Sequence, residues 1–229
     1  MFERPHHQRI AKLLKAFEPV LLQRANCYFA GGTAISLALG EYRESVDVDF
    51  LCADIAGYRV LRSALAGGTF GSLVTVPLAY TREVRTSRDK VSAFVEVDDV
   101  PIKVEFVLEG RIAVGGAFSP MLGVPVLSHE DLYAEKLLAN ADRGMDRSVR
   151  SRDLIDLGAM IMHWGPIPDA AWEKAIAAYG ESVRESYEKA RVLIRDERYF
   201  RSCIDAMSMD PALMQELYEA LQGAPDIRG

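Results

Sequence analysis

The sequence is poor in the residues and segments that mark secreted, membrane-spanning or zinc-binding proteins. It has three cysteines in 229 residues, and Cys27, Cys52 and Cys203 form no metal-type pair. We therefore expect reduced, buried thiols in a cytoplasmic protein. No apolar run reaches the length of a membrane span, and the N-terminal residues lack the layout of a signal peptide. Both absences argue against a membrane protein and agree with a cytoplasmic location.

Histidine is also scarce, and none of the four histidines stands in a convincing metal or catalytic motif. His129 and Glu130 lack the second histidine of a zinc-protease helix, which excludes that class of enzyme. We expect His6 and His7 to be exposed, and His163 to be a packing residue at a helix end.

Charge and composition describe a globular protein. The formal net charge is -6, which argues against broad nonspecific binding of nucleic acid but allows a local basic patch. Hydrophobic residues make up 49% of the chain, enough to build a core. The length suits one large domain or a catalytic domain with a helical extension, and the sequence has no internal repeat.

The strongest functional pattern lies in residues 29–51. Gly31 and Gly32 form a predicted turn before a short apolar helix, and the free N–H groups at a helix start bind phosphate. Asp47 and Asp49 follow on a predicted strand, so their carboxylates lie on the same face. Such a pair suits Mg²⁺, which binds through one or two carboxylates and substrate phosphates. The pattern predicts a nucleotide-handling site.

Either half of this pattern is weak when taken alone. Glycines occur in turns of every kind, and aspartates at alternate strand positions usually form a solvated sheet face. The order and separation of the two halves are much less common, so their combination favours a functional site.

Further segments extend the pattern along the chain. A strand-like stretch at 102–107 carries Glu105, an Asp-Leu-x-x-x-Lys segment ends at Lys136, and an Arg-x-Arg-Asp-x-x-Asp segment ends at Asp156. Together with the Arg-x-Ser-x-Asp-Val-Asp segment at 43–49, they resemble the AbiEii/AbiGii toxin branch of the DNA polymerase β-like nucleotidyltransferase superfamily.

The chain departs from the usual motifs of that branch at two positions. Thr33 stands where many superfamily members have serine, so its hydroxyl would take the place of the serine hydroxyl. Arg152 stands where the branch usually has lysine, which keeps the charge but changes the donor geometry. The motifs span residues 28–157, more than half of the chain.

The resemblance implies a division of roles among the site residues. Mg²⁺, with Mn²⁺ as the alternative, would be held by three carboxylates: Asp47, Asp49 and Glu105. The phosphates of a nucleoside triphosphate would be bound by the glycine turn and residues near it: Gly31, Gly32, Thr33 and Ser45. Lys136 would bind the β and γ phosphates, and either Asp153 or Asp156 would orient Lys136 or a substrate group. The three metal carboxylates, Lys136 and these two aspartates form the predicted catalytic set.

The residues of the later motif also have a plain interpretation. Without the resemblance, Lys136 reads as a solvated lysine on a helix. Asp153 and Asp156, each with an arginine one turn earlier, read as an ion-pair ladder on a helix surface, worth a few tenths of a kcal/mol per pair.

Arginines cluster between the two halves of the later motif. The predicted acceptor-binding residues are Arg147, Arg150 and Arg152, in a stretch that also contains Arg143 and several aspartates. This stretch is either a solvated linker or a patch that binds a phosphodiester backbone, and we favour the patch. A second basic run at 80–88 could line the substrate approach.

The resemblance implies a Mg²⁺-dependent enzyme that transfers a nucleoside monophosphate from a nucleoside triphosphate and releases pyrophosphate. In that branch the acceptor is the 3′ end of tRNA or a protein side chain, and the enzyme is the toxin of a toxin–antitoxin or phage abortive-infection system with a cognate antitoxin. One alternative is a small-molecule, antibiotic-type nucleotidyltransferase, which gives no reason for the arginine-rich linker. The other is a non-catalytic regulatory protein on the same fold, which would be expected to have lost a metal carboxylate.

Periodicity predicts an α+β fold. We expect a polymerase β-like nucleotidyltransferase mixed sheet flanked by helices, followed by a C-terminal helical bundle. The nucleotidyltransferase core domain would cover residues 1–125, and a helical domain that completes the active site would cover 126–229.

The expected elements follow in chain order. In the first domain they are a helix over 5–24 broken near Pro19, a strand at 27–30, a helix at 33–39, a strand at 45–52, a helix at 56–66, a β-rich stretch at 72–114 and a connector at 120–125. In the second domain they are a helix at 129–142, a second helix that carries the apolar residues 154, 157 and 161 and ends near Gly165, and helices at 169–179, 182–195 and 211–221, with a short helix before the last. Gly158 costs its helix about 1 kcal/mol relative to alanine, so we expect close packing there.

Overall fold

The computed structural model describes residues 2–223, and the chain divides into two compact units. The sheet unit comprises Met1–Leu37 and Ser45–Ser128, and the helical unit comprises Ala38–Glu44 and His129–Gly229. The backbone therefore passes between the units three times. The predicted domain boundary at residue 125 falls inside a strand of the sheet unit.

A mixed sheet of seven strands forms the centre of the sheet unit within the described residues. The strands are β1 (Cys27–Ala30), β2 (Val48–Cys52), β3 (Ala79–Thr86), β4 (Lys90–Val97), β5 (Val100–Leu108), β6 (Gly116–Ser119) and β7 (Val124–Leu127). Their order across the sheet is β3-β4-β5-β2-β1-β7-β6. The pairs β2–β5 and β1–β7 are parallel, and the other pairs are antiparallel.

The connector predicted at 120–125 is confirmed for residues 120–123, which form the turn of an antiparallel hairpin, and is wrong for residues 124 and 125, which belong to β7. Both strands are only four residues long, and Pro125 lies within β7. Strands this short, one of them containing proline, carry little periodic signal.

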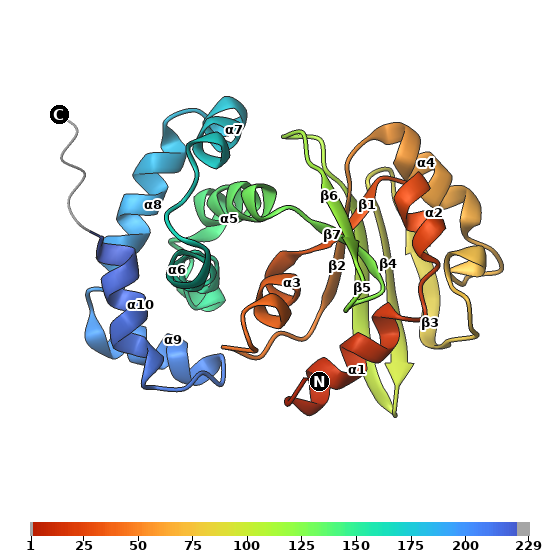
Figure 1. Cartoon of the computed structure of the whole chain (residues 1–229), viewed down its shortest axis with the longest axis horizontal. Coiled ribbons are helices and arrows are strands. Elements are labelled where there is room, and N and C mark those ends of the chain that lie inside the picture. Colours follow the sequence, from red (N-terminus) through yellow and green to blue (C-terminus); the bar gives the residue numbers. More distant parts are fainter. Residues whose placement is uncertain (1, 224–229) are drawn as a thin grey trace. The chain divides into compact units, whose positions relative to one another are not determined.

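Four helices belong to the first part of the chain: α1 (Pro5–Leu14), α2 (Pro19–Arg24), α3 (Gly31–Ala38) and α4 (Ile55–Ala64). A short 3₁₀ helix follows at Gly71–Leu73. The predicted break near Pro19 is confirmed, since this proline begins α2. Figure 1 shows α1, α2 and α4 on one face of the sheet.

The hydrophobic core of the sheet unit lies between that sheet face and the three helices. Alternate strand residues point into it, among them Phe29, Phe50 and Phe106, which are fully buried. The rings of Phe50 and Phe106 stack with centroids 4.7 Å apart. Because the apolar residues of β2 and β5 face this core, the residues that alternate with them along each strand face the other side of the sheet. The predicted site residues lie on that side.

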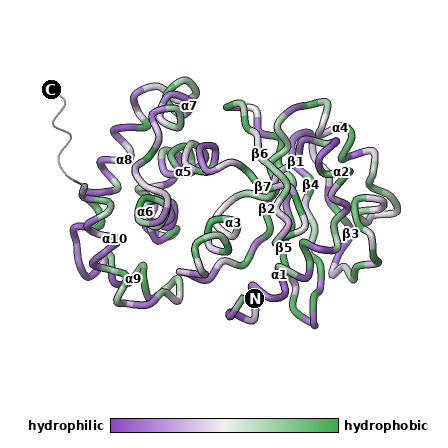
Figure 2. Tube along the Cα trace, viewed as in Figure 1, coloured by the Kyte–Doolittle hydropathy of each residue, from purple (hydrophilic) through white to green (hydrophobic). Residues whose placement is uncertain are grey.

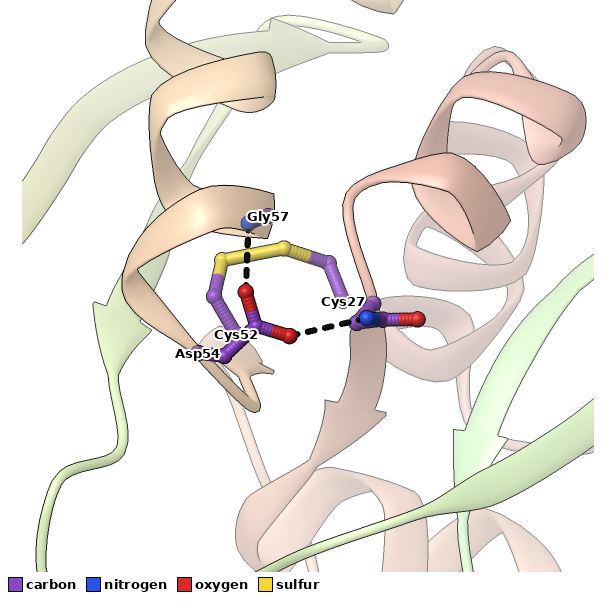
Figure 3. Close-up of a disulfide and its surroundings, with 5 residues drawn as sticks. Cys27, Cys52, Asp54 and Gly57 are labelled. Atoms are coloured by element: carbon purple, nitrogen blue, oxygen red, sulfur yellow. Dashed lines mark hydrogen bonds between the residues drawn. A yellow bond between two sulfur atoms is a disulfide. The ribbon is translucent and has the colours of Figure 1, made fainter.

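A disulfide joins Cys27 at the start of β1 to Cys52 at the end of β2 (Figure 3). The two residues are directly opposite in the antiparallel pair, with Cα atoms 4.1 Å apart. Next to the disulfide, Asp54 caps α4 by accepting a hydrogen bond from the N–H of Gly57. The prediction of three reduced thiols is therefore wrong for two of them, and Cys203 is a buried free thiol. The cysteine argument for a reducing compartment no longer holds.

The helical unit contains six α-helices within the described residues: α5 (His129–Arg143), α6 (Arg152–Trp164), α7 (Asp169–Tyr179), α8 (Ser182–Leu193), α9 (Glu197–Ala206) and α10 (Leu213–Gln222). A 3₁₀ helix, Arg147–Val149, precedes α6. Helix α5 packs against α6, α7 and α8, and α10 packs against α6 and α9. All the predicted helices of this region are confirmed, and the trace in Figure 2 alternates between hydrophilic and hydrophobic along α8 and α10.

Close packing at Gly158 is also confirmed. A Cβ atom added there would lie 3.0 Å from the side chain of Leu221 and 3.2 Å from that of Leu217, both in α10. The missing side chain lets α10 approach α6. None of the helices in residues 2–223 is both long and apolar enough to cross a bilayer.

Candidate active site

The two glycines of the predicted turn, Gly31 and Gly32, are the first residues of α3 and follow β1 directly. Gly31 has φ +74°, a left-handed conformation that glycine adopts at low cost. A Cβ atom at this position would lie 2.8 Å from Oδ2 of Asp49. Glycine is therefore required twice over, by the backbone conformation and by the carboxylate that lies against the turn.

The paired aspartates are positioned by β2. Asp49 lies in this strand opposite Ala30 of β1 on one side and opposite Glu105 of β5 on the other. The strand begins at Val48, later than predicted, so Asp47 lies just before it. Strand alternation places the carboxylates of Asp49 and Glu105 on the same sheet face. The sheet thus brings together the glycine turn and the three predicted metal carboxylates.

Thr33 fixes the segment that leads into the paired aspartates. Its hydroxyl donates to the carbonyl oxygen of Asp47 at 2.5 Å and lies 2.8 Å from the hydroxyl of Ser45. The side chain is 1% exposed, so it joins the start of α3 to the approach of β2. Phosphate binding by Thr33 and Ser45 stays a prediction.

Two histidines that sequence reasoning placed at the surface hold the same segment. Nε2 of His7 accepts a hydrogen bond from the N–H of Ser45 at 3.1 Å, and His6 bonds the carbonyl oxygen of Val46 at 3.0 Å. His7 is completely buried, so the prediction of exposure is wrong for this residue. The apolar side of α1, to which His7 belongs, could have indicated this.

Glu105 forms ion pairs with two lysines. Its carboxylate lies 2.8 Å from Nζ of Lys103 and 3.1 Å from Nζ of Lys90. Burial alone would raise the pKa of Glu105, but hydrogen bonds from both lysines lower it. A hydrogen bond to Glu105 raises the pKa of Lys103, and the negative charges of Asp47 and Asp49 add to this effect. Lys103 therefore lies in the field of all three carboxylates.

Three carboxylates of the sheet unit are candidate ligands for a divalent cation. Hard cations take oxygen ligands, and the three carboxylates on one sheet face supply them. Their attraction of the Lys103 ammonium shows that the cluster favours a positive charge. Within residues 2–223, no group of three carboxylate, histidine or cysteine side chains is arranged as a complete metal-binding set. Metal binding by Asp47, Asp49 and Glu105 therefore stays a prediction.

The later motif forms a buried ionic network inside the helical unit. Nζ of Lys136 in α5 lies 3.0 Å from Asp153 and 2.6 Å from Asp156, both in α6. Arg143 binds Asp153, and Arg43 binds Asp156. Neither the solvated lysine nor the surface ladder is found, because Lys136 and both aspartates are buried and each aspartate pairs outside α6. Both predicted orienting aspartates bind Lys136.

This network keeps its members charged. Burial alone would raise the pKa of Asp153, but the charge of Lys136 and hydrogen bonds from Arg143 lower it. The pKa of Asp156 is lowered in the same way against burial, mainly by Arg43 and Lys136. Burial would lower the pKa of Lys136, and the two aspartates raise it instead. Triphosphate binding by Lys136 stays a prediction, since its ammonium already has two carboxylate partners.

The predicted acceptor-binding arginines lie in and around the loop before α6. Arg147, Arg150 and Arg152 are exposed, and the guanidinium of Arg147 stacks on the ring of Tyr199 at 4.9 Å. Arg143, in the same arginine-rich stretch, is bound to Asp153. The loop therefore has exposed positive charge, and its role in acceptor binding stays a prediction.

Comparison with solved structures identifies the fold. A "putative nucleotidyltransferase" from Helicobacter pylori has a TM-score of 0.52 and 17% identity, with 94% of this chain and 92% of that chain covered. JHP933 from Helicobacter pylori has the same score and identity, with 97% and 92% covered. No curated protein sequence matches the chain. These similarities and the mixed sheet confirm the predicted α+β nucleotidyltransferase fold.

The family follows from the sequence as a whole. The family model described as "Nucleotidyl transferase AbiEii toxin, Type IV TA system" matches residues 12–225. The chain belongs to this family of nucleotidyltransferase toxins, and the resemblance seen in its motifs is confirmed.

Proposed function

We propose that this protein transfers a nucleoside monophosphate from a nucleoside triphosphate to a macromolecular acceptor and releases pyrophosphate. The observation that carries the proposal is that Asp49 lies against Gly31, because a helix start can bind phosphate and a carboxylate beside it can bind a metal ion. In the reaction, an acceptor hydroxyl attacks the α-phosphorus, and the bond to the bridging oxygen of pyrophosphate breaks. The hydroxyl proton passes to water.

The predicted site residues of the sheet unit would contribute by positioning the substrate or by charge, which is what phosphoryl transfer requires. The backbone N–H groups of Gly31 and Gly32 would bind the phosphates of the nucleotide. Asp47 and Asp49 would hold Mg²⁺ or Mn²⁺, which neutralises phosphate charge when bound. The hydrogen bonds of Thr33 with Ser45 and with the carbonyl oxygen of Asp47 would keep the aspartates in place.

The acceptor we propose is RNA, such as the 3′ end of tRNA, with a protein side chain as the competing outcome. Exposed arginines at 147, 150 and 152 support RNA, since cations on a loop bind a phosphodiester backbone. As a member of a toxin family, the protein would slow bacterial growth, and a cognate antitoxin would relieve this.

The test uses the full chain, each of the four nucleoside triphosphates labelled at the α-phosphorus, Mg²⁺ and a bacterial extract. We expect label to enter material that ribonuclease removes and protease does not. Asp49→Asn should abolish transfer, whereas Asp99→Asn, in the exposed turn between β4 and β5, should not. Label lost on protease treatment would replace the RNA acceptor by a protein, and no labelling with any nucleotide would overturn the proposal.

A further inference from the structure

The two lysines on Glu105 occupy the carboxylate that would otherwise complete the metal site. Lys103 approaches one carboxylate oxygen of Glu105 and Lys90 approaches the other, so both oxygens are engaged. The Glu105 side chain is only 14% exposed, whereas those of Lys103 and Lys90 are 34% and 47% exposed. A largely buried carboxylate between two ammonium groups is well satisfied without a metal ion.

Strand register places Lys103 closer to the paired aspartates than Lys90. Lys103 and Glu105 lie in β5, which pairs directly with β2, and Val48 is opposite Val104. Lys103 precedes Val104 in β5 as Asp47 precedes Val48, the first residue of β2, so Lys103 lies at the end of the strand pair where Asp47 enters β2. Lys90 lies in β4, on the side of β5 away from β2, opposite Val107. Lys103 is thus the ammonium group next to the proposed metal-binding pair.

The charges of the site agree with a single metal ion. One divalent cation and the two ammonium groups exceed the three carboxylates by one positive charge. Two divalent cations without the lysines would give the same excess. The lysines can therefore supply the charge that a second metal ion supplies in a two-metal site.

We propose that Lys103, held in place by Glu105, contacts the reacting phosphate and takes the place of a second metal ion. This inference rests on the proposed function. Glu105 is then a positioning residue for Lys103, in contrast to the third metal ligand that the sequence predicts. The site binds one divalent cation, through Asp47 and Asp49, together with the nucleotide.

The first measurement counts metal ions without using activity. The full chain is titrated with Mn²⁺ in the presence of a nucleoside triphosphate analogue with a methylene bridge between its α and β phosphorus atoms, and bound Mn²⁺ is followed by electron paramagnetic resonance. We expect one Mn²⁺ per chain in the wild type and in Glu105→Gln, and a loss of binding in Asp49→Asn. Two ions in the wild type, one of them lost in Glu105→Gln, would overturn the proposal.

The second measurement compares lysine variants in the transfer reaction. Lys103→Met should lower kcat about 100-fold, the effect of losing one preorganised charge at a reacting oxygen, with the Mn²⁺ count unchanged. Lys90→Met should lower kcat less, and Lys103→Arg should recover part of the loss. Lys12→Met, which removes an exposed ion pair with Asp98, is the control for a surface lysine.

Equal losses of kcat in Lys103→Met and Lys90→Met, or full activity of Lys103→Met, would overturn the proposal. Thermal unfolding of each variant shows whether a loss of kcat reflects misfolding. If Lys103→Met is misfolded, the kcat of Lys103→Arg decides whether the ammonium group contributes. If the wild type transfers no nucleotide, the proposed function fails, while the Mn²⁺ count and its response to Glu105→Gln still decide whether Glu105 is a metal ligand.

Discussion

Arg43 binds Asp156 with two hydrogen bonds across 113 residues of sequence. Its Nε lies 2.6 Å from one carboxylate oxygen and its second terminal nitrogen lies 3.0 Å from the other. Tyr42 donates its hydroxyl to the same carboxylate. Two residues after Arg43 the chain reaches Ser45, which bonds Thr33 and His7. The short segment 42–45 therefore supplies two partners of Asp156 in the helical unit and, at Ser45, the residue that leads to the paired aspartates in the sheet unit.

Removing the central cation of this network should destabilise the protein strongly. Lys136→Met leaves Asp153 and Asp156 with less compensating charge, so we expect the free energy of unfolding to fall by about 3–5 kcal/mol. The control is Lys174→Met, because Lys174 also binds two carboxylates but its side chain is 31% exposed. That variant should lose less than Lys136→Met, because Lys174 and Glu130 are partly exposed, although Asp131 is buried. Urea unfolding of both variants measures the difference.

The same two variants test the predicted contact between Lys136 and the triphosphate. If this contact exists, the folded Lys136→Met protein should bind nucleotide more weakly than Lys174→Met. Equal nucleotide affinity would limit Lys136 to the network. Equal stability of the two variants would contradict the assignment of the network as a buried stabilising element.

Acid should weaken the protein through the same network. The pKa of Asp153 is lowered in the folded protein, so its contribution to stability is complete above the unfolded pKa and is lost as the pH falls through the folded one. We expect the free energy of unfolding to decline below about pH 4, the ordinary range of an aspartate. In Asp153→Asn the decline between about pH 4 and pH 2 should be shallower. An identical slope in the variant would show that Asp153 does not take part.

A methyl group at Gly31 should damage the site more than the fold. Gly31→Ala places a side chain in a left-handed backbone, at a cost of about 1–2 kcal/mol, and pushes against Asp49. Gly67→Ala is a matched control, since Gly67 has φ +56° and no atom within 4 Å of an added Cβ. We expect similar losses of thermal stability in both variants and a loss of nucleotide transfer only in Gly31→Ala. Full activity of Gly31→Ala would show that the turn need not touch Asp49.

The disulfide predicts a definite thiol count. Under denaturing conditions without reductant, one thiol per chain should react with an alkylating reagent, and after reduction three should react. Replacing Cys27 and Cys52 together by alanine should lower the free energy of unfolding by about 2–4 kcal/mol, since the bond joins residues 25 positions apart in the sequence. Mass spectrometry checks the count, and three reactive thiols without reductant would contradict the bond.

Local patterns in the sequence predicted most of the helices correctly. The apolar periodicity of α7 and α8, the proline that begins α2 and the packing glycine at 158 each act within one or two turns of chain. A pattern of this kind can be read without knowing which segments meet in space. The strand that carries Asp49 was predictable for the same reason.

Features that depend on strand register or distant contacts could not be predicted. Cys27 and Cys52 are recognised as a pair only when β1 and β2 are aligned. Without the family resemblance, which links Lys136 to Asp153 and Asp156, its place in the helix pattern predicts only a solvated lysine. The burial of His7 follows from contacts that the N-terminal position of the residue conceals. In each case the partner lies far away along the chain, and sequence spacing carries no record of it.

The assignment of Ala38–Glu44 to the helical unit limits how the protein can be divided or recombined. A fragment beginning at His129 would contain every helix of that unit but would leave Asp156 without the guanidinium and phenol that bind it. A fragment ending at Ser128 would carry Arg43 without its carboxylate. Exchange of C-terminal halves between relatives would therefore preserve the network only if Ala38–Glu44 is exchanged with them. The helical unit is thus encoded by two separate segments of the chain, and both must come from the same relative.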